Sequence, residues 1–235
     1  DVAPDGTAFT ITGKVGAPFV VLIHGLGLCQ QMWCEHASYF EANYQLLRYD
    51  LLGHGFSAPP ANKITLSLYA NQLLGLLDYV GVSRAAVIGF SIGGMINRRF
   101  ALDYPDRLSV LAVLNSPHDR GVDAQATVEA RAAAVLDEGV MATMDDALVR
   151  WFTSSFRADN ESYMNDVRAW RQKVDFSSYA EAAWVLAAGV KELTCPKNSV
   201  SIPTIVITSE NDSGSTPRMC KAIALEIKGA EYVIV

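Results

Sequence analysis

Short apolar segments recur along the chain and alternate with longer amphipathic ones. Runs that are apolar at every position, such as residues 19–23, are typical of strands buried on both faces of a parallel sheet. Segments with apolar residues at alternate positions and turn residues at both ends also indicate strands. On these grounds we predict strands at residues 7–12, 19–23, 44–49, 85–90, 107–114, 202–208 and 231–235.

Several segments between these strands have the 3.6-residue periodicity of helices that lie against a sheet. The clearest covers residues 66–80, where the apolar side chains share one face and Gly81 marks the end. Residues 31–40 and 92–102 show the same pattern, and residues 215–217 (Ser-Thr-Pro) have the cap-then-proline order of a helix start. Because strands and helices alternate, we predict an α/β fold with a mostly parallel central sheet and helices on both faces.

Residues 120–196 differ from the rest of the chain, because they are rich in alanine and contain three of the four tryptophans. Their helical patterns fall between one predicted strand and the next. We therefore expect one domain in which residues 1–119 and 197–235 form the α/β core and residues 120–196 form an inserted helical cap. Ligands bind at the carboxyl edge of open parallel sheets, and Trp151 of the cap is a candidate to line a pocket there.

The predicted strand 85–90 runs directly into Ser91, which has one glycine two residues before it and another two residues after it. This G-x-S-x-G pattern is typical of a nucleophile elbow, a sharp strand-to-helix turn that holds a serine clear of the backbone with a positive φ. Strand and helix come close together at Gly89 and Gly93, where a Cβ atom would crowd the turn. The alternative, an ordinary loop serine, does not account for the strand before it and the helix after it.

A second glycine-rich turn, residues 24–27, follows the buried strand 19–23. The backbone of such a turn can approach a ligand closely, so we expect the amides of Leu26 and Ile92 to form an oxyanion hole. A dinucleotide site is the rival interpretation, but it requires a third glycine and a following helix. His24 orients this loop in our interpretation and does not serve as a base.

Two aspartates follow predicted strands on the edge that carries Ser91. Asp212 comes after strand 202–208, and Asp119 comes after strand 107–114. An aspartate at such a place either assists catalysis or only accepts hydrogen bonds from turn amides. We take Asp212 as the catalytic acid and Asp119 as the alternative. His118 ends a strand at the same edge and is a second candidate for the pocket.

The composition narrows the choice of partners. With 235 residues, 50% of them hydrophobic, the chain can bury a large core in one domain. The formal net charge of −6 and the pI near 5.2 argue against nucleic acid or an anionic membrane surface, because either would require a basic patch. A small-molecule substrate fits this charge better.

The cysteine spacing and the hydropathy narrow the choice of compartment. No apolar run reaches the ~18 residues of a membrane span, and no signal-peptide pattern opens the sequence. The four cysteines lack the spacing of a zinc site and the density of a disulfide framework. We therefore expect free, mostly buried thiols, no metal and a cytoplasmic protein.

Four motifs occur in order along the chain, followed by Asp212: HGLG at 24–27, YDLLGHGFS at 49–57, GFSIGG at 89–94 and YPDRL at 104–108. With these motifs the chain resembles the α/β-hydrolase superfamily over nearly its whole length. Within that superfamily it is most similar to the 3-oxoadipate enol-lactonase group, because Arg48-Tyr49-Asp50 and the segment 139–153, which contains Arg150-Trp151-Phe152-Thr153, match the pattern of that group.

The resemblance implies a cofactor-free hydrolase in which Ser91 attacks a carbonyl, Asp212 orients a histidine, and the amides of Leu26 and Ile92 hold the oxyanion. The catalytic histidine of the family follows the last strand, and none of the four histidines here stands at a matching position. We therefore expect a chain that is truncated after Val235 and lacks its closing C-terminal helix. A sheet edge bared in this way favours homo-oligomers.

The leading functional hypothesis is a serine hydrolase of small carboxylic esters or (enol-)lactones that works through an acyl-enzyme on Ser91. A hydrolase that cleaves C–C bonds of ring-fission diketones would share the same residues. A ligand-sensing, non-catalytic member of the fold is the alternative from a different class, because the serine needs a base to become nucleophilic.

Overall fold

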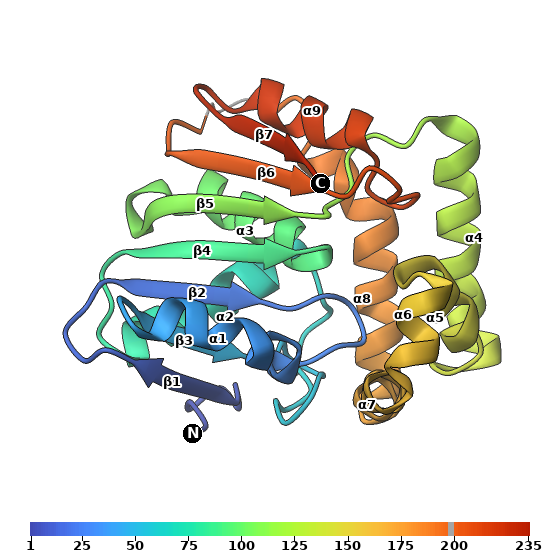
Figure 1. Ribbon diagram of the computed structural model, residues 1–235, viewed down its shortest axis with the longest axis horizontal. Coiled ribbons are helices and arrows are strands. Elements are labelled where there is room, and N and C mark those ends of the chain that lie inside the picture. Colours follow the sequence, from blue (N-terminus) through green and yellow to red (C-terminus); the bar gives the residue numbers. More distant parts are fainter. Residues whose placement is uncertain (197–199) are drawn as a thin grey trace.

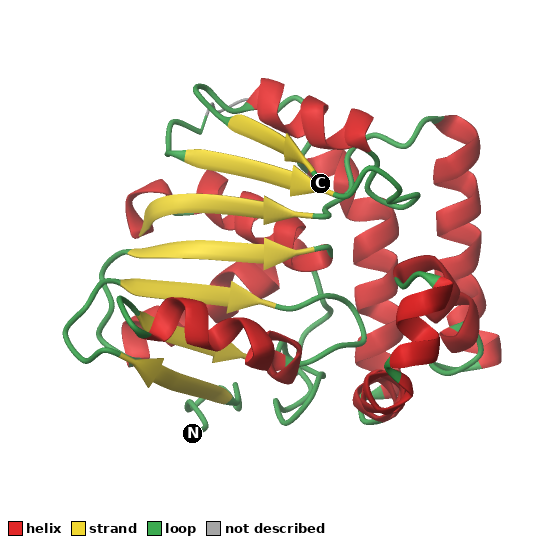
Figure 2. Cartoon of the chain, viewed as in Figure 1, coloured by secondary structure: helices red, strands yellow, loops and turns green. Residues whose placement is uncertain are grey.

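A seven-stranded sheet forms the centre of the computed structural model, which describes residues 1–196 and 200–235. The strand order is β1-β3-β2-β4-β5-β6-β7; β1 is antiparallel to β3, and every other neighbouring pair is parallel. The strands are β1 (Phe9–Gly13), β2 (Phe19–Ile23), β3 (Gln45–Tyr49), β4 (Ala85–Phe90), β5 (Leu108–Leu114), β6 (Thr204–Thr208) and β7 (Glu231–Ile234). Helices lie on both faces of this sheet, so the predicted fold is confirmed (Figure 1, Figure 2).

The helices connect the parallel strands, as the alternating sequence pattern predicts. They are α1 (Cys34–Glu41), α2 (Leu66–Tyr79), α3 (Ile92–Asp103), α4 (Val122–Glu138), α5 (Met144–Trp151), α6 (Ser154–Asp159), α7 (Glu161–Gln172), α8 (Phe176–Ala188) and α9 (Pro217–Glu226). The predicted helix at 31–40 is divided, because a 3-10 turn (Gln30–Trp33) precedes α1. Thr216 caps α9 by accepting a hydrogen bond from the amide of Met219, with Pro217 at the first helical position, as predicted.

Successive side chains of each central strand face opposite layers of the molecule. In β2, Val21 packs in one core cluster with side chains of α2, α3 and α9, whereas Leu22 packs in another with Trp33 and Ala37 of the α1 segment. Both strand side chains are fully buried. Burying a valine or leucine completely stabilises a fold by about 1.5–3 kcal/mol, so this two-sided burial explains why these strands are apolar at every position.

The helices α4 to α8 follow β5 in the sequence and lie beyond the carboxyl ends of the parallel strands (Figure 1). They form two packing clusters. Ala132 and Val135 of α4 pack with Tyr179 and Ala183 of α8. Side chains of α5 and α7 pack against Leu28, in the turn after β2. We use the word cap for α4 to α8; the exact limits expected for this insertion, residues 120–196, stay a prediction.

None of the helices in the described parts of the chain is long and apolar enough to cross a lipid bilayer.

The crossing of β4 and α3 gives a first testable prediction. A Cβ atom at Gly89 would overlap the carbonyl of Gly93, and a Cβ atom at Gly93 would lie 2.6 Å from the carbonyl oxygen of Ile23. Gly89→Ala should therefore lower the free energy of unfolding by about 3 kcal/mol, the upper range for overpacking. Urea denaturation measures this change.

Gly75→Ala is the matched control, because Gly75 lies in the middle of α2 and nothing surrounds the position of an added Cβ. This substitution should raise stability by about 0.5–1 kcal/mol, through helix propensity alone. Equal effects of the two substitutions would contradict the close approach of strand and helix.

Candidate active site

Ser91 occupies the turn between β4 and α3, at the carboxyl edge of the sheet. Its backbone has φ 57° and ψ −116°, so the predicted positive φ is confirmed. The amide of Ser91 donates to the carbonyl of Leu114 (2.9 Å), and its carbonyl accepts from the amide of Gly94 (3.0 Å). A non-glycine residue in this region carries about 1–3 kcal/mol of strain and persists only where its surroundings hold it.

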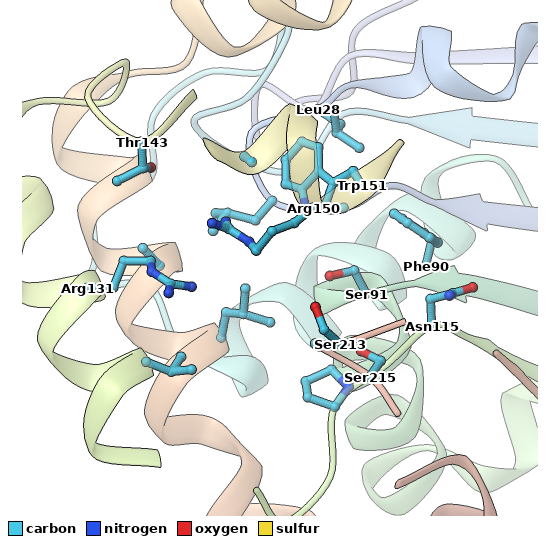
Figure 3. A pocket seen from close by; sticks show the side chains of 18 of the residues that line it. Leu28, Phe90, Ser91, Asn115, Arg131, Thr143, Arg150, Trp151, Ser213 and Ser215 are labelled. Atoms are coloured by element: carbon cyan, nitrogen blue, oxygen red, sulfur yellow. The ribbon is translucent and has the colours of Figure 1, made fainter. Parts of the chain in front are cut away.

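A cavity of about 590 Å³ opens between this sheet edge and the cap. Ser91 lines it together with Leu26, Asp212 and Trp151, so the structure brings these four sequence-predicted residues to one place. Figure 3 shows Ser91 on one side of the cavity and Trp151, from α5, on the other. Most of the lining residues are apolar, but several charged and polar side chains also face the cavity, as is usual for a site that binds a small molecule.

Asp212 lies in the turn after β6, and both of its carboxylate oxygens accept hydrogen bonds. Oδ1 accepts from the amides of Gly214 and Ser215 (both 2.8 Å), and Oδ2 accepts from Nδ2 of Asn115 (2.7 Å). Asp212 therefore orders its own turn and is itself held in place from the neighbouring strand β5. The turn-capping role and a role in the site do not exclude each other.

Asn115 is a site residue that the sequence did not single out. It follows β5 directly, has a positive φ of 44°, and its backbone amide donates to the carbonyl of Ile207 (2.8 Å). Its role depends on the adjacency of β5 and β6, which the strand order reveals and the local sequence does not.

The backbone amides of Leu26 and Ile92, the two expected donors to an oxyanion, lie in different segments of the chain. Leu26 lines the cavity in the turn after β2. Ile92 is fully buried as the first residue of α3, where its amide has no acceptor within the helix. Each amide lies in a segment that adjoins Ser91, across the sheet or along the chain.

Two buried histidines, His24 and His54, stabilise the turns at the edge of the sheet. Nε2 of His24 accepts from the amide of Leu51 (2.9 Å), so its Nδ1 carries the proton and donates to the carbonyl of Gly25 (2.8 Å). The ring of His54 lies 5.4 Å from that of His24. Burial lowers the pKa of His24 to about 4 and that of His54 to about 3. Both rings are therefore neutral at pH 7 and serve as hydrogen-bonding groups.

The prediction that His118 lines the pocket is wrong. His118 is buried in the segment after β5, and its Nε2 lies 3.0 Å from Oε1 of Glu226 in α9, so the ring lies against that helix and does not line the cavity. His36 is exposed on α1. Among the residues that the structure describes, no histidine lines the cavity.

The alternative acid, Asp119, does not line the cavity either. It is exposed and accepts a hydrogen bond from the amide of Gly121 (2.9 Å), which makes it a turn-capping residue. The cysteines are free as predicted, but only Cys29 and Cys220 are buried, so the expectation of mostly buried thiols is half wrong.

Asp50 accepts a hydrogen bond from a turn amide, that of Phe56 (3.0 Å), and another from the amide of Gln30 (2.7 Å) in the 3-10 turn before α1. Its carboxylate is fully buried and joins two loops at the edge of the sheet.

Four arginines line the cavity and were not assigned to it from the sequence: Arg120, Arg131, Arg150 and Arg171. Only the position of Arg131 within the helical pattern could have indicated that it faces a cavity. On α4, Val128, Arg131, Ala132 and Val135 share one helical face, so a charged residue falls among the apolar ones. Charge on the inward face of a helix needs a partner, and only the tertiary structure shows that this face looks into a cavity.

Known proteins resemble the chain over most of its length. A family model described as alpha/beta hydrolase fold matches residues 18–235. A 3-oxoadipate enol-lactonase of Acinetobacter baylyi is 28% identical over 216 residues, which cover 92% of this chain and 78% of that protein. An (E)-2-((N-methylformamido)methylene)succinate hydrolase of the same organism is 27% identical over 217 residues, or 92% of this chain and 81% of the relative.

Among solved structures, the enol-lactonase from Burkholderia xenovorans matches with a TM-score of 0.88 at 28% identity, over 97% of this chain and 87% of that one.

The buried histidines give a prediction for acid stability. The unfolded chain binds protons at the ordinary histidine pKa of 6.5, whereas the folded chain binds them only near pH 4 or below. The contribution of these two histidines to the free energy of unfolding is therefore fully present above pH 6.5. It falls as the pH drops from 6.5 toward 4, by up to about 1.4 kcal/mol per pH unit for each histidine. Urea unfolding between pH 7 and 4.5 measures the slope.

His54→Leu should make this slope shallower, and His36→Gln should not, because His36 is exposed. If the wild-type protein and both variants lose stability in parallel, the buried histidines are not the cause.

Proposed function

Because this chain belongs to the alpha/beta hydrolase fold family, we propose that it is a serine hydrolase of small carboxylic esters or enol-lactones. The observation that carries the proposal is Ser91 itself. It has a positive φ at the end of a buried strand, precedes the first turn of α3, and lines a cavity of about 590 Å³. A serine in this geometry is presented to a carbonyl that enters from the cap side.

The bond type is inferred from two similar proteins. One is by name an enol-lactonase and the other a hydrolase of a methylenesuccinate. An enol-lactone is an internal ester, so both an open ester and a lactone present the same carbonyl to the serine. The cavity volume suits a small substrate of this kind.

The reaction proceeds in two acyl-transfer steps. A base takes the proton of Ser91 Oγ, and Oγ bonds to the carbonyl carbon to form a tetrahedral oxyanion near the amides of Leu26 and Ile92. The ester bond then breaks, the leaving oxygen takes the proton from the base, and an acyl-enzyme remains on Ser91. Water, deprotonated by the same base, releases the acid and frees the serine.

Asp212 orients the base in this proposal, since its carboxylate is held by Asn115 and lines the same cavity as Ser91. His24, His36, His54 and His118 do not line that cavity, so the base is a residue other than these four.

Ser91→Ala should abolish hydrolysis while the protein stays folded. Loss of a nucleophile of this type lowers kcat by about a thousandfold or more, because the covalent route is closed. Stability should stay equal or rise, because active-site residues are commonly kept for function at a cost in stability. Ester turnover and thermal unfolding measure the two effects, and Ser83→Ala, an exposed serine outside the cavity, is the control. Turnover above about a tenth of wild type would exclude Ser91 as the nucleophile.

A substrate panel separates the proposal from its rivals. We expect turnover of aryl esters and an enol-lactone by the full-length protein and little turnover of a ring-fission diketone. Turnover of the diketone alone would identify a C–C bond hydrolase with the same residues. Tight binding of a small ligand without repeated turnover would identify a ligand-sensing protein.

A further inference from the structure

The cavity carries a concentration of positive charge that differs from the charge of the whole chain. The formal net charge is −6. Yet Arg120, Arg131, Arg150 and Arg171 line the cavity, and the carboxylate of Asp212 is the acidic side chain that faces them among the described residues. Asp212 is already bonded to Asn115 and to its own turn. The arginines therefore have no carboxylate of their own in the cavity.

Two of the four arginines, Arg120 and Arg171, use their side chains to stabilise the cap. Arg120 donates to the carbonyls of Leu186 (2.9 Å) and Ala187 (3.1 Å), and so ties the loop before α4 to the end of α8. Arg171 donates to Oγ1 of Thr143 (2.8 Å), and its guanidinium lies 4.7 Å from the ring centre of Tyr179. These contacts hold both guanidinium groups without a ligand, although Nε of Arg171 has no hydrogen-bond partner among the described residues.

Arg131 and Arg150 make no such contacts. Within the described residues, neither side chain makes a hydrogen bond or an ion pair. Both are exposed, and in Figure 3 both side chains extend into the cavity. The pKa of Arg150 is lowered, first by burial of part of its side chain and next by the positive charge of Arg131, while Asp146 acts in the opposite direction. Two guanidinium groups thus repel each other across a space that is open to a ligand.

The two arginines also come from different halves of the cap. Arg131 lies on α4, which packs against α8. Arg150 lies on α5, which packs with α7 against Leu28. An anion held by both guanidinium groups would join the two clusters within the cavity that Ser91 also lines.

We propose that Arg131 and Arg150 form a subsite for a second carboxylate of the substrate, away from the carbonyl that Ser91 attacks. This inference rests on the proposed function and adds the charge of the substrate to it: the enzyme selects esters or lactones that are themselves carboxylic acids. A guanidinium fork matches the two oxygens of a carboxylate, and two forks around one anion replace their mutual repulsion by attraction.

The kinetic test compares two esters that differ in one charge, 4-nitrophenyl butyrate and the mono-4-nitrophenyl ester of glutaric acid. The wild-type protein should prefer the acidic ester in kcat/KM. Arg131→Gln and Arg150→Gln should each lower kcat/KM for the acidic ester by about 10- to 100-fold, the usual worth of a hydrogen bond to a charged group, and change the neutral ester by less than about twofold. Arg150→Lys should recover part of the loss.

Arg168→Gln is the matched control, because Arg168 lies on the cap helix α7, pairs with Asp145 and does not line the cavity. It should leave the preference for the acidic ester unchanged. A wild-type protein without this preference, or variants that lose activity equally on both esters, would overturn the subsite.

A binding experiment keeps this test separate from the hydrolytic reaction. Titration calorimetry of glutarate into the full-length Ser91→Ala protein should show binding, and this should be lost in Ser91→Ala combined with Arg131→Gln and Arg150→Gln. Unchanged binding in the triple variant would overturn the subsite, and so would binding of inorganic phosphate in preference to glutarate. Loss of all ester turnover with glutarate binding intact would contradict the proposed function and leave the anion subsite standing.

Discussion

The close approach of β4 and α3 is the constraint on which the site depends. The carbonyl of Gly93 occupies the space where a Cβ of Gly89 would lie, and Gly93 itself packs against the carbonyls of Ile23 and His24. The chain can turn this sharply only because these positions lack side chains, and the turn leaves Ser91 with φ 57°. Fully buried side chains of α3, such as Met95 and Phe100, fix the helix on the sheet, so the strain at the serine cannot relax.

The ionisable groups on the sheet side of the cavity differ from those on the cap side. Next to the sheet, His24 and His54 are neutral because burial lowers their pKa, and the carboxylate of Asp50 is satisfied by amides. Such groups hold loops in place without adding charge. Across the cavity, the cap presents guanidinium groups that have no carboxylate partners there. One wall therefore holds the reacting group rigidly, and the other is suited to recognise charge on a ligand.

Local sequence patterns predicted the elbow because its requirements are local: an apolar strand, small residues around the serine and a helix after it. The helix start at Thr216-Pro217 was predictable for the same reason. Asn115 was not, since its contact with Asp212 depends on which strand lies beside β5. His118 follows β5 at the expected edge, but its ring lies against Glu226, more than a hundred residues away in the sequence, and does not line the cavity. The arginines of the cap faced a cavity that only the packing of α4, α5 and α7 defines.

Covalent labelling tests most directly whether Ser91 is the nucleophile of an acyl-enzyme. The full-length protein would be treated with a fluorophosphonate, and the modified residue located by mass spectrometry of peptides. We expect a single adduct on Ser91, loss of esterase activity in proportion to labelling, and no adduct in Ser91→Ala. An adduct on another residue would contradict the role of Ser91 as the nucleophile. Loss of esterase activity on treatment, with Ser91 unmodified, would contradict it as well.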